Sequence, residues 1–123
     1  MAVSVTSSGV SSPFAVRAID ITDLENTGLN DFVSSSTTVY SLDLDNSANG
    51  AVTYFKLYDN ASPTYGTTQP SLMIQVPAST RAVWTIARGL LLTSGFSVMA
   101  STDDGEGAAG APGSSFNVSV VCT

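Results

Sequence analysis

Apolar and polar side chains alternate in short runs along most of the chain, and turn-forming residues separate the runs. The clearest run is Val39–Asp45, in which Tyr40, Leu42 and Leu44 share one face while serine and aspartate occupy the other. A period of two residues is typical of a β-strand with one buried face. This alternation predicts an all-β fold.

Eight runs have this character. The predicted strands are Val3–Val5, Phe14–Ile19, Val39–Asp45, Val52–Asp59, Leu72–Val76, Ala82–Ile86, Phe96–Ala100 and Ser115–Val121. The last six strands, taken in consecutive pairs, predict three antiparallel hairpins. Seven or eight strands at a spacing of roughly 8–12 residues indicate one antiparallel β-sandwich or small barrel, in the style of an immunoglobulin domain or a jelly roll.

The length of 123 residues is that of one domain. We expect residues 1–13 to be an extended N-terminal arm, with Val3 and Val5 as contact residues that add a strand to a neighbouring protein. Residues 14–123 are expected to form the single β-sandwich domain. Residues 21–32 are the best helix candidate, but Gly28 and Asn30 limit it to a short turn. The segment 101–114 is expected to be an exposed, mobile loop.

The charge of the chain argues against two classes of partner. Its net charge is −6, and its only basic residues are Arg17, Lys56, Arg81 and Arg88. Binding to nucleic acid or to an anionic membrane depends on clustered basic side chains, so neither partner is expected. Charged residues make up 11% of the chain, against 19 serines and 14 threonines. A surface with many hydroxyl groups and few charges is more readily turned into a protein interface.

The sequence offers little for catalysis or for binding a cofactor. It contains no histidine and one cysteine, which excludes histidine-dependent triads and a typical zinc site. No glycine-rich phosphate-binding motif is present. We therefore expect no enzymatic activity and no cofactor. Cys122 is expected to be a buried residue at the end of the last strand.

The carboxylates are better explained by solvation than by chemistry. The run Asp103-Asp104-Gly105-Glu106 is only loosely similar to a calcium loop and lacks the EF-hand spacing, so a solvated acidic loop is the preferred interpretation. Asp43 and Asp45 project from the same face of one strand. They are expected to protect a sheet edge from pairing with another chain.

The aromatic residues allow two interpretations each. Trp84 is in phase with the apolar residues of its strand, which predicts a core position; the alternative is an exposed platform for a sugar ring. Tyr54 and Tyr58 share one face of their strand, which indicates either a second buried layer or a contact surface. Tyr65 is expected on a loop and is a further candidate contact residue.

The middle of the chain resembles a known group of proteins. The segments that carry the resemblance are Lys56-Leu-Tyr-Asp59, Ala61-Ser-Pro-Thr64, Gly66-Thr-Thr-Gln-Pro70, Leu72, Val76-Pro-Ala78, Gly89-Leu90 and Thr93-Ser-Gly-Phe-Ser-Val98. Over about Val39 to Ala100 they are similar to small β-sandwich virion proteins of tailed bacteriophages, including phages of cyanobacteria and marine bacteria. The resemblance rests on strand and turn signatures and carries no catalytic or metal-binding residues.

This resemblance implies a structural protein of the virion, most concretely a capsid decoration (cement) protein that binds the lattice of the major capsid protein. It implies synthesis in the host bacterial cytoplasm, capsid or other virion proteins as partners, and by analogy a homotrimer. A neck, tail or baseplate component is the alternative within the same class. A carbohydrate-binding module that uses Trp84, Tyr54, Tyr58 and Tyr65 is the alternative outside it.

Overall fold

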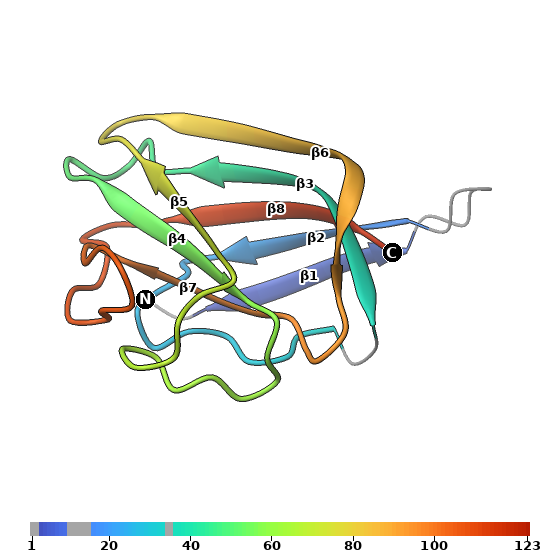
Figure 1. The fold of residues 1–123 in the computed structure, drawn as a ribbon. Helices are drawn as coiled ribbons and strands as arrows, with labels where there is room; N and C mark the ends of the chain where they lie inside the picture. Colours follow the sequence, from blue (N-terminus) through green and yellow to red (C-terminus); the bar gives the residue numbers. More distant parts are fainter. Residues whose placement is uncertain (1–2, 10–15, 34–35) are drawn as a thin grey trace.

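The computed structural model describes residues 3–9, 16–33 and 36–123, and these residues form two antiparallel sheets and no helix (Figure 1). The five-stranded sheet has the order β1 (Ser4–Gly9), β2 (Arg17–Thr22), β8 (Asn117–Cys122), β3 (Thr37–Asp45) and β6 (Arg81–Leu92). The three-stranded sheet has the order β5 (Leu72–Val76), β4 (Thr53–Tyr58) and β7 (Ser97–Ser101). The predicted all-β sandwich is confirmed.

The strand pairs are nested along the chain. β2 pairs with β8, β3 with β6, and β4 with β5, all antiparallel. Leu29, which lies between β2 and β3 in the sequence, forms a single β-bridge to Val98 of β7. This bridge is the remaining pair of the nested series. Nested antiparallel pairs that are distributed over two packed sheets have the connectivity of a jelly roll. β1 is an additional strand on the far side of β2.

The three predicted hairpins are wrong, although their strands exist. β3 and β4 lie in different sheets, as do β5 and β6, and β7 and β8. Each of these connections carries the chain across the sandwich instead of back along a neighbouring strand. The alternation in the sequence identifies the buried face of each strand. The same face is buried whether the next strand lies beside it in one sheet or opposite it in the other sheet, so alternation does not predict which strands pair.

The N-terminal region forms part of the sheet. Residues Ser4–Gly9 pair with β2 in a regular antiparallel ladder, so this part of the predicted arm is an edge strand within its own molecule. The other residues of the predicted arm, 1–2 and 10–13, and the predicted strand start at Phe14 lie outside the described residues. In the range 21–32 of the candidate helix, Ile21 and Thr22 end β2, and the residues after them form an irregular segment that contains a turn and the Leu29 bridge.

The core fills the space between the two sheets. Phe55, Leu57, Ile74 and Val76 of the smaller sheet are each at most 2% exposed. They face equally buried residues of the larger sheet, namely Ile19, Ile21, Val39, Leu42, Leu44, Val118, Val120 and Cys122. Cys122 is buried at the end of the last strand, as predicted. The described part of the chain contains no helix long and apolar enough to cross a membrane.

A buried asparagine ties one end of the sandwich together. Asn46 is 0% exposed and follows β3 directly. Its Nδ2 donates to the carbonyl oxygens of Ala51, Val76 and Pro77 at 3.0, 3.1 and 3.0 Å. Its Oδ1 accepts a hydrogen bond from the Thr53 hydroxyl at 2.9 Å. One side chain therefore joins the end of β3, the start of β4 and the end of β5.

Replacing Asn46 tests this role. The Asn46→Ala variant should lose about 3 kcal/mol of unfolding free energy, because the buried Val76 carbonyl, the buried Thr53 hydroxyl and two part-buried carbonyls lose their partner together. Urea denaturation followed by tryptophan fluorescence measures the loss. The control is Asn60→Ala, which removes only an exposed hydrogen bond to the Ser62 amide and should cost less than about 1 kcal/mol. Equal losses in the two variants would contradict the special role of Asn46.

Candidate interaction surface

Trp84 lies at the rim of the sandwich and not in its core. It pairs with Leu42 in register, which places it on the inner face of the five-stranded sheet, yet it is 49% exposed. The prediction of a core position is therefore wrong. β6 is the edge of the five-stranded sheet, and at this edge the Trp84 side chain stays half-exposed.

The same strand exposes two more apolar side chains. Val83 is 63% exposed and lies beside Asp43 of β3 on the outer face, and Leu91 is 60% exposed. Among the described residues, six large hydrophobic side chains are exposed; three lie on β6, and the others are Val5, Met73 and Val121. Val83 and Leu91 were not predicted as contact residues, although apolar residues at both odd and even positions of this strand indicated that both of its faces carry apolar side chains.

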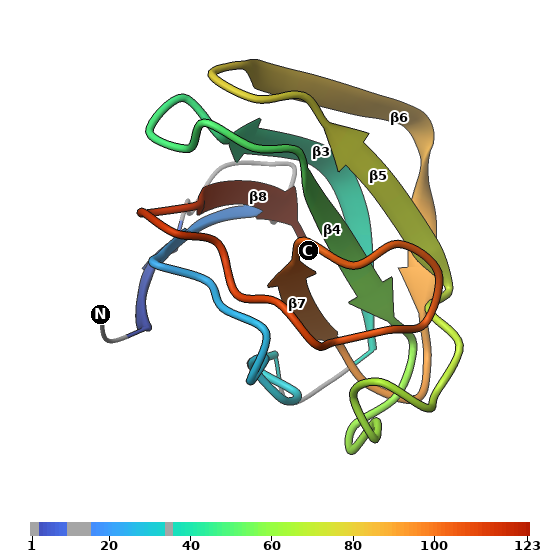
Figure 2. The ribbon, with the colours of Figure 1, turned by 90° about the vertical axis from the view of Figure 1, so that its left-hand side faces the viewer.

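The outer face of the three-stranded sheet is covered by loops at β4 and β7 but exposed at β5, where Met73 is 42% exposed. Lys56 and Met99 are adjacent across β4 and β7, and both are 0% exposed. In Figure 2 the orange-red connection between β7 and β8 passes in front of this sheet. This connection is the segment predicted to be an exposed, mobile loop, and most of its residues are exposed. A hydrogen bond from Thr102 N to Gly110 O closes the loop, and one from Asn26 Nδ2 to Ala108 O ties it to the segment between β2 and β3.

Lys56 holds the β7–β8 loop to the sheet. Its Nζ donates a 2.5 Å hydrogen bond to the carbonyl oxygen of Gly107. Burial lowers the pKa of Lys56, and the carboxylates of Asp103 and Asp104 oppose this shift because they favour the charged amine. The acidic run of the loop therefore has a structural partner in Lys56, which the sequence reasoning did not identify.

Tyr58 and Tyr65 are packed against each other. Their ring centroids are 5.3 Å apart in an edge-to-face arrangement, and Tyr58 is 1% exposed. The Tyr65 ring also lies against Gly28, where a Cβ atom would collide with it. Of the two interpretations of the tyrosine stripe, the second buried layer is correct for Tyr58. Tyr65 lies on the β4–β5 loop as predicted, but its ring serves to pack that loop down.

The remaining candidate contact residues lie apart from this cluster. Val3 is half-buried against the core, and Val5 on β1 is 42% exposed. Tyr54 is half-buried on the outer face of β4. β1 and β4 belong to different sheets, so the structure does not gather the five predicted residues into one surface.

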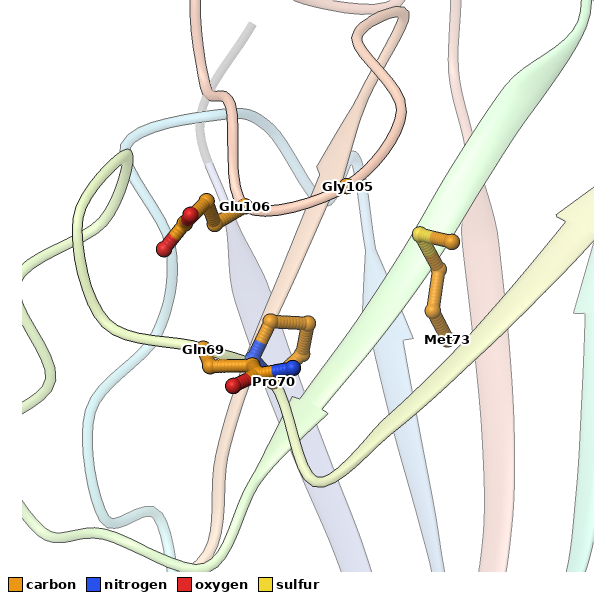
Figure 3. Close-up of a pocket in the computed structure, with 5 residues that line it drawn as sticks. All are labelled: Gln69, Pro70, Met73, Gly105 and Glu106. Atoms are coloured by element: carbon orange, nitrogen blue, oxygen red, sulfur yellow. The ribbon is translucent and has the colours of Figure 1, made fainter.

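A shallow pocket lies between the β4–β5 and β7–β8 loops. It has a volume of about 260 Å³ and is lined by Gln69, Pro70, Met73, Gly105 and Glu106 (Figure 3). Figure 3 shows Gly105 and Glu106 above Gln69 and Pro70, with Met73 reaching in from β5. One carboxylate and one amide can form hydrogen bonds with a small polar molecule. The lining contains no second carboxylate with which Glu106 could share acid–base catalysis.

The acidic residues of β3 do not guard an edge. β3 lies between β8 and β6, so the expectation that Asp43 and Asp45 protect a sheet edge is wrong. Asp43 accepts two hydrogen bonds from Arg81, at 2.7 and 2.6 Å. Two hydrogen bonds from Ser47 lower the pKa of Asp45. Within the described part of the chain, no three carboxylate or thiol groups gather where they could hold a metal ion.

Comparison with known proteins adds no family: no family model matches the chain, and no curated protein is significantly similar to it. The features of this molecule that bear on its function are therefore the exposed strand edges and the covered face described above.

The buried hydroxyl of Tyr58 provides a sharp stability test. Among the described residues it has no hydrogen-bond partner. The Tyr58→Phe variant should be more stable than the parent chain by about 1 kcal/mol, because it removes an unsatisfied buried polar group and keeps the ring contact. Tyr65→Phe is the matched control and should be destabilised, because the Tyr65 hydroxyl donates to Asn30 Oδ1 at 2.6 Å. Thermal unfolding measures both; a loss of stability in Tyr58→Phe would contradict the argument.

The tyrosine pair also predicts how stability changes at alkaline pH. Burial raises the pKa of Tyr65 from 10.0 to about 12, and burial also raises the pKa of Tyr58. Between pH 10.0 and about pH 12, Tyr65 is ionised in the unfolded chain but neutral in the folded chain, so the free energy of unfolding falls as pH rises. Below the pKa of Tyr65 in the unfolded chain, the stabilisation is fully present. Urea midpoints measured across this window should fall less steeply for Tyr65→Phe than for the parent chain; identical slopes would contradict the prediction.

Proposed function

We propose that this chain is a non-enzymatic structural protein of a bacteriophage virion, made in the host cytoplasm, and most concretely a capsid decoration protein. The observation that supports the proposal best is β1, a strand at the free edge of the five-stranded sheet whose Val5 is 42% exposed. The strand contains no charged residue. An uncharged edge strand can extend its ladder into a neighbouring protein through main-chain hydrogen bonds.

Other features of the surface agree with this role. The face that could have carried a tyrosine-lined binding site is covered by loops, and the pocket at its margin is shallow. The net charge of −6 avoids competition for packaged DNA. Partners on this proposal are the major capsid protein and further copies of the chain.

Binding to capsid shells tests the proposal. The purified protein should co-sediment with empty shells assembled from the major capsid protein of the source phage. Val5→Lys should weaken binding strongly, because a charge on the edge strand opposes strand addition. Met73→Lys, which changes an equally exposed apolar residue on the other sheet, should bind like the parent chain. No binding to shells, with binding to neck, tail or baseplate proteins, would move the assignment to that alternative within the virion.

A carbohydrate-binding module is the second candidate, and the 49% exposure of Trp84 is the observation that favours it. Tyr58 cannot take part in such a site, because it is buried under Tyr65. Titration with glucose, galactose and N-acetylglucosamine, followed by the fluorescence of Trp84, separates the two functions. The proposed structural role predicts no change in emission; saturable quenching by one sugar would support the module.

A further inference from the structure

The five-stranded sheet ends at β6 in an edge that no described residue pairs with. On one side β6 pairs with β3; on the other, no backbone hydrogen bond from another segment reaches residues 82–91 of the described structure. Figures 1 and 2 show β6 along the rim of the molecule. The edge exposes Val83 and Trp84 next to each other, one on each face of the sheet. Within the described ranges, this edge is a β-pairing surface without a partner strand, and it carries apolar side chains on both faces.

The usual protection of such an edge is missing here. Natural edge strands carry charges, proline or an early bulge that prevent pairing with another chain. Residues 82–87 of β6 contain neither a charge nor a proline. Arg81 has a charge, but its guanidinium is held over β3 by its two hydrogen bonds to Asp43. A bulge does interrupt β6, but only after Thr85, where the register with β3 shifts.

The directions of the two edge strands, β1 and β6, determine how copies of the chain can pair in an antiparallel ladder. Four successive antiparallel pairings separate β1 from β6, so the two free edges of the sheet run parallel. A ring of copies that joined β6 to β1 of the next copy would need a parallel ladder, which is the less stable kind per residue. Two β6 strands related by a two-fold axis perpendicular to the sheet would instead run antiparallel, like every described ladder in this protein.

In one register, the side chains of two β6 strands from two copies of the chain are complementary to each other. If the two-fold axis passes at Val83, then Val83 faces Val83 of the second copy on the outer face. On the inner face Trp84 faces the second copy's Ala82, so the largest side chain lies opposite a small one. Arg81 then faces a threonine, Thr85.

We propose that β6 is a homodimer interface in which two copies join their five-stranded sheets through an antiparallel β6–β6 ladder centred on Val83. The ladder covers residues 81–85, because beyond Thr85 the bulge turns the strand away. Gly89 has a φ of 77° within that bulge and lies against Thr38 and Tyr40 of β3. The inference does not depend on the capsid proposal, which uses the opposite edge, β1, and it takes the place of the trimer expected by analogy.

Disulfide trapping tests the register directly. Directly opposed cross-strand residues have Cβ atoms roughly 5 Å apart, close to the span of a disulfide. Val83→Cys should therefore give a covalent dimer on mild oxidation. In Thr85→Cys the two thiols would be about 13 Å apart along the ladder, and no dimer should form. Cys122 does not interfere, because it is 0% exposed and burial raises its pKa, which suppresses the thiolate.

A second pair of variants tests the interface without a covalent bond. The parent chain should sediment as a dimer whose proportion rises with concentration, since a short ladder with two tryptophan contacts is a modest interface. Val83→Lys should give a monomer, because two lysines would meet on the axis. Leu91→Lys, on the same strand and equally exposed but beyond the bulge, should remain dimeric. Circular dichroism checks that both variants stay folded.

Three outcomes would overturn the proposal. They are a parent chain that stays monomeric at the highest soluble concentration, covalent dimers of Thr85→Cys in the same yield as those of Val83→Cys, and a mass of three chains that Val83→Lys leaves unchanged. Loss of capsid binding in Val5→Lys with an intact dimer would leave this interface standing, so the two proposals fail separately.

Discussion

The hydrogen bonds of the Asn46 side chain are the constraint on which the arrangement of this sandwich depends. A chain that leaves one sheet and enters the other must turn through a region where main-chain groups have no ladder partner, and buried unpaired groups are costly. Asn46 supplies two donors and an acceptor to three such segments at once. Asn49 continues this network: its Nδ2 donates to Ser115 O, and its Oδ1 accepts from Ser114 N. Two asparagines thus fix the point where three crossings between the sheets meet.

This explains how much of the fold was predictable. Alternation of side chains is a local signal, so the strands of the core and their buried faces were predicted, with Leu72–Val76 matching β5 residue for residue. Strand pairing is not local. A run of turn residues such as Asn46–Gly50 looks the same whether it closes a hairpin or carries the chain across the sandwich. The difference depends on contacts of Asn46 with Val76 and Pro77, which are distant in sequence.

The candidate contact residues were harder to predict for a related reason. The alternation predicts that the Tyr58 side chain points outward from its sheet and that the Trp84 side chain points toward the core. Both predictions of the face are correct. Their exposure was not what the face implied: Tyr58 is buried because the Tyr65 loop folds over it, and Trp84 is exposed because β6 is an edge. Exposure depends on what lies above a face, and that is decided by loops and sheet order, about which strand periodicity carries no information.

The two edge strands of the five-stranded sheet differ in length and in side chains, so the molecule offers a different pairing surface at each edge. β1 is short and made mostly of hydroxyl residues, so it offers a partner mainly its main chain. β6 is twice as long and places Val83 and Trp84 on its two faces, so its side chains can distinguish one partner from another. Main-chain pairing provides affinity with little selectivity, while side-chain complementarity sets register and partner. A protein with one edge of each kind can join a copy of itself at β6 and still present β1 to a different surface.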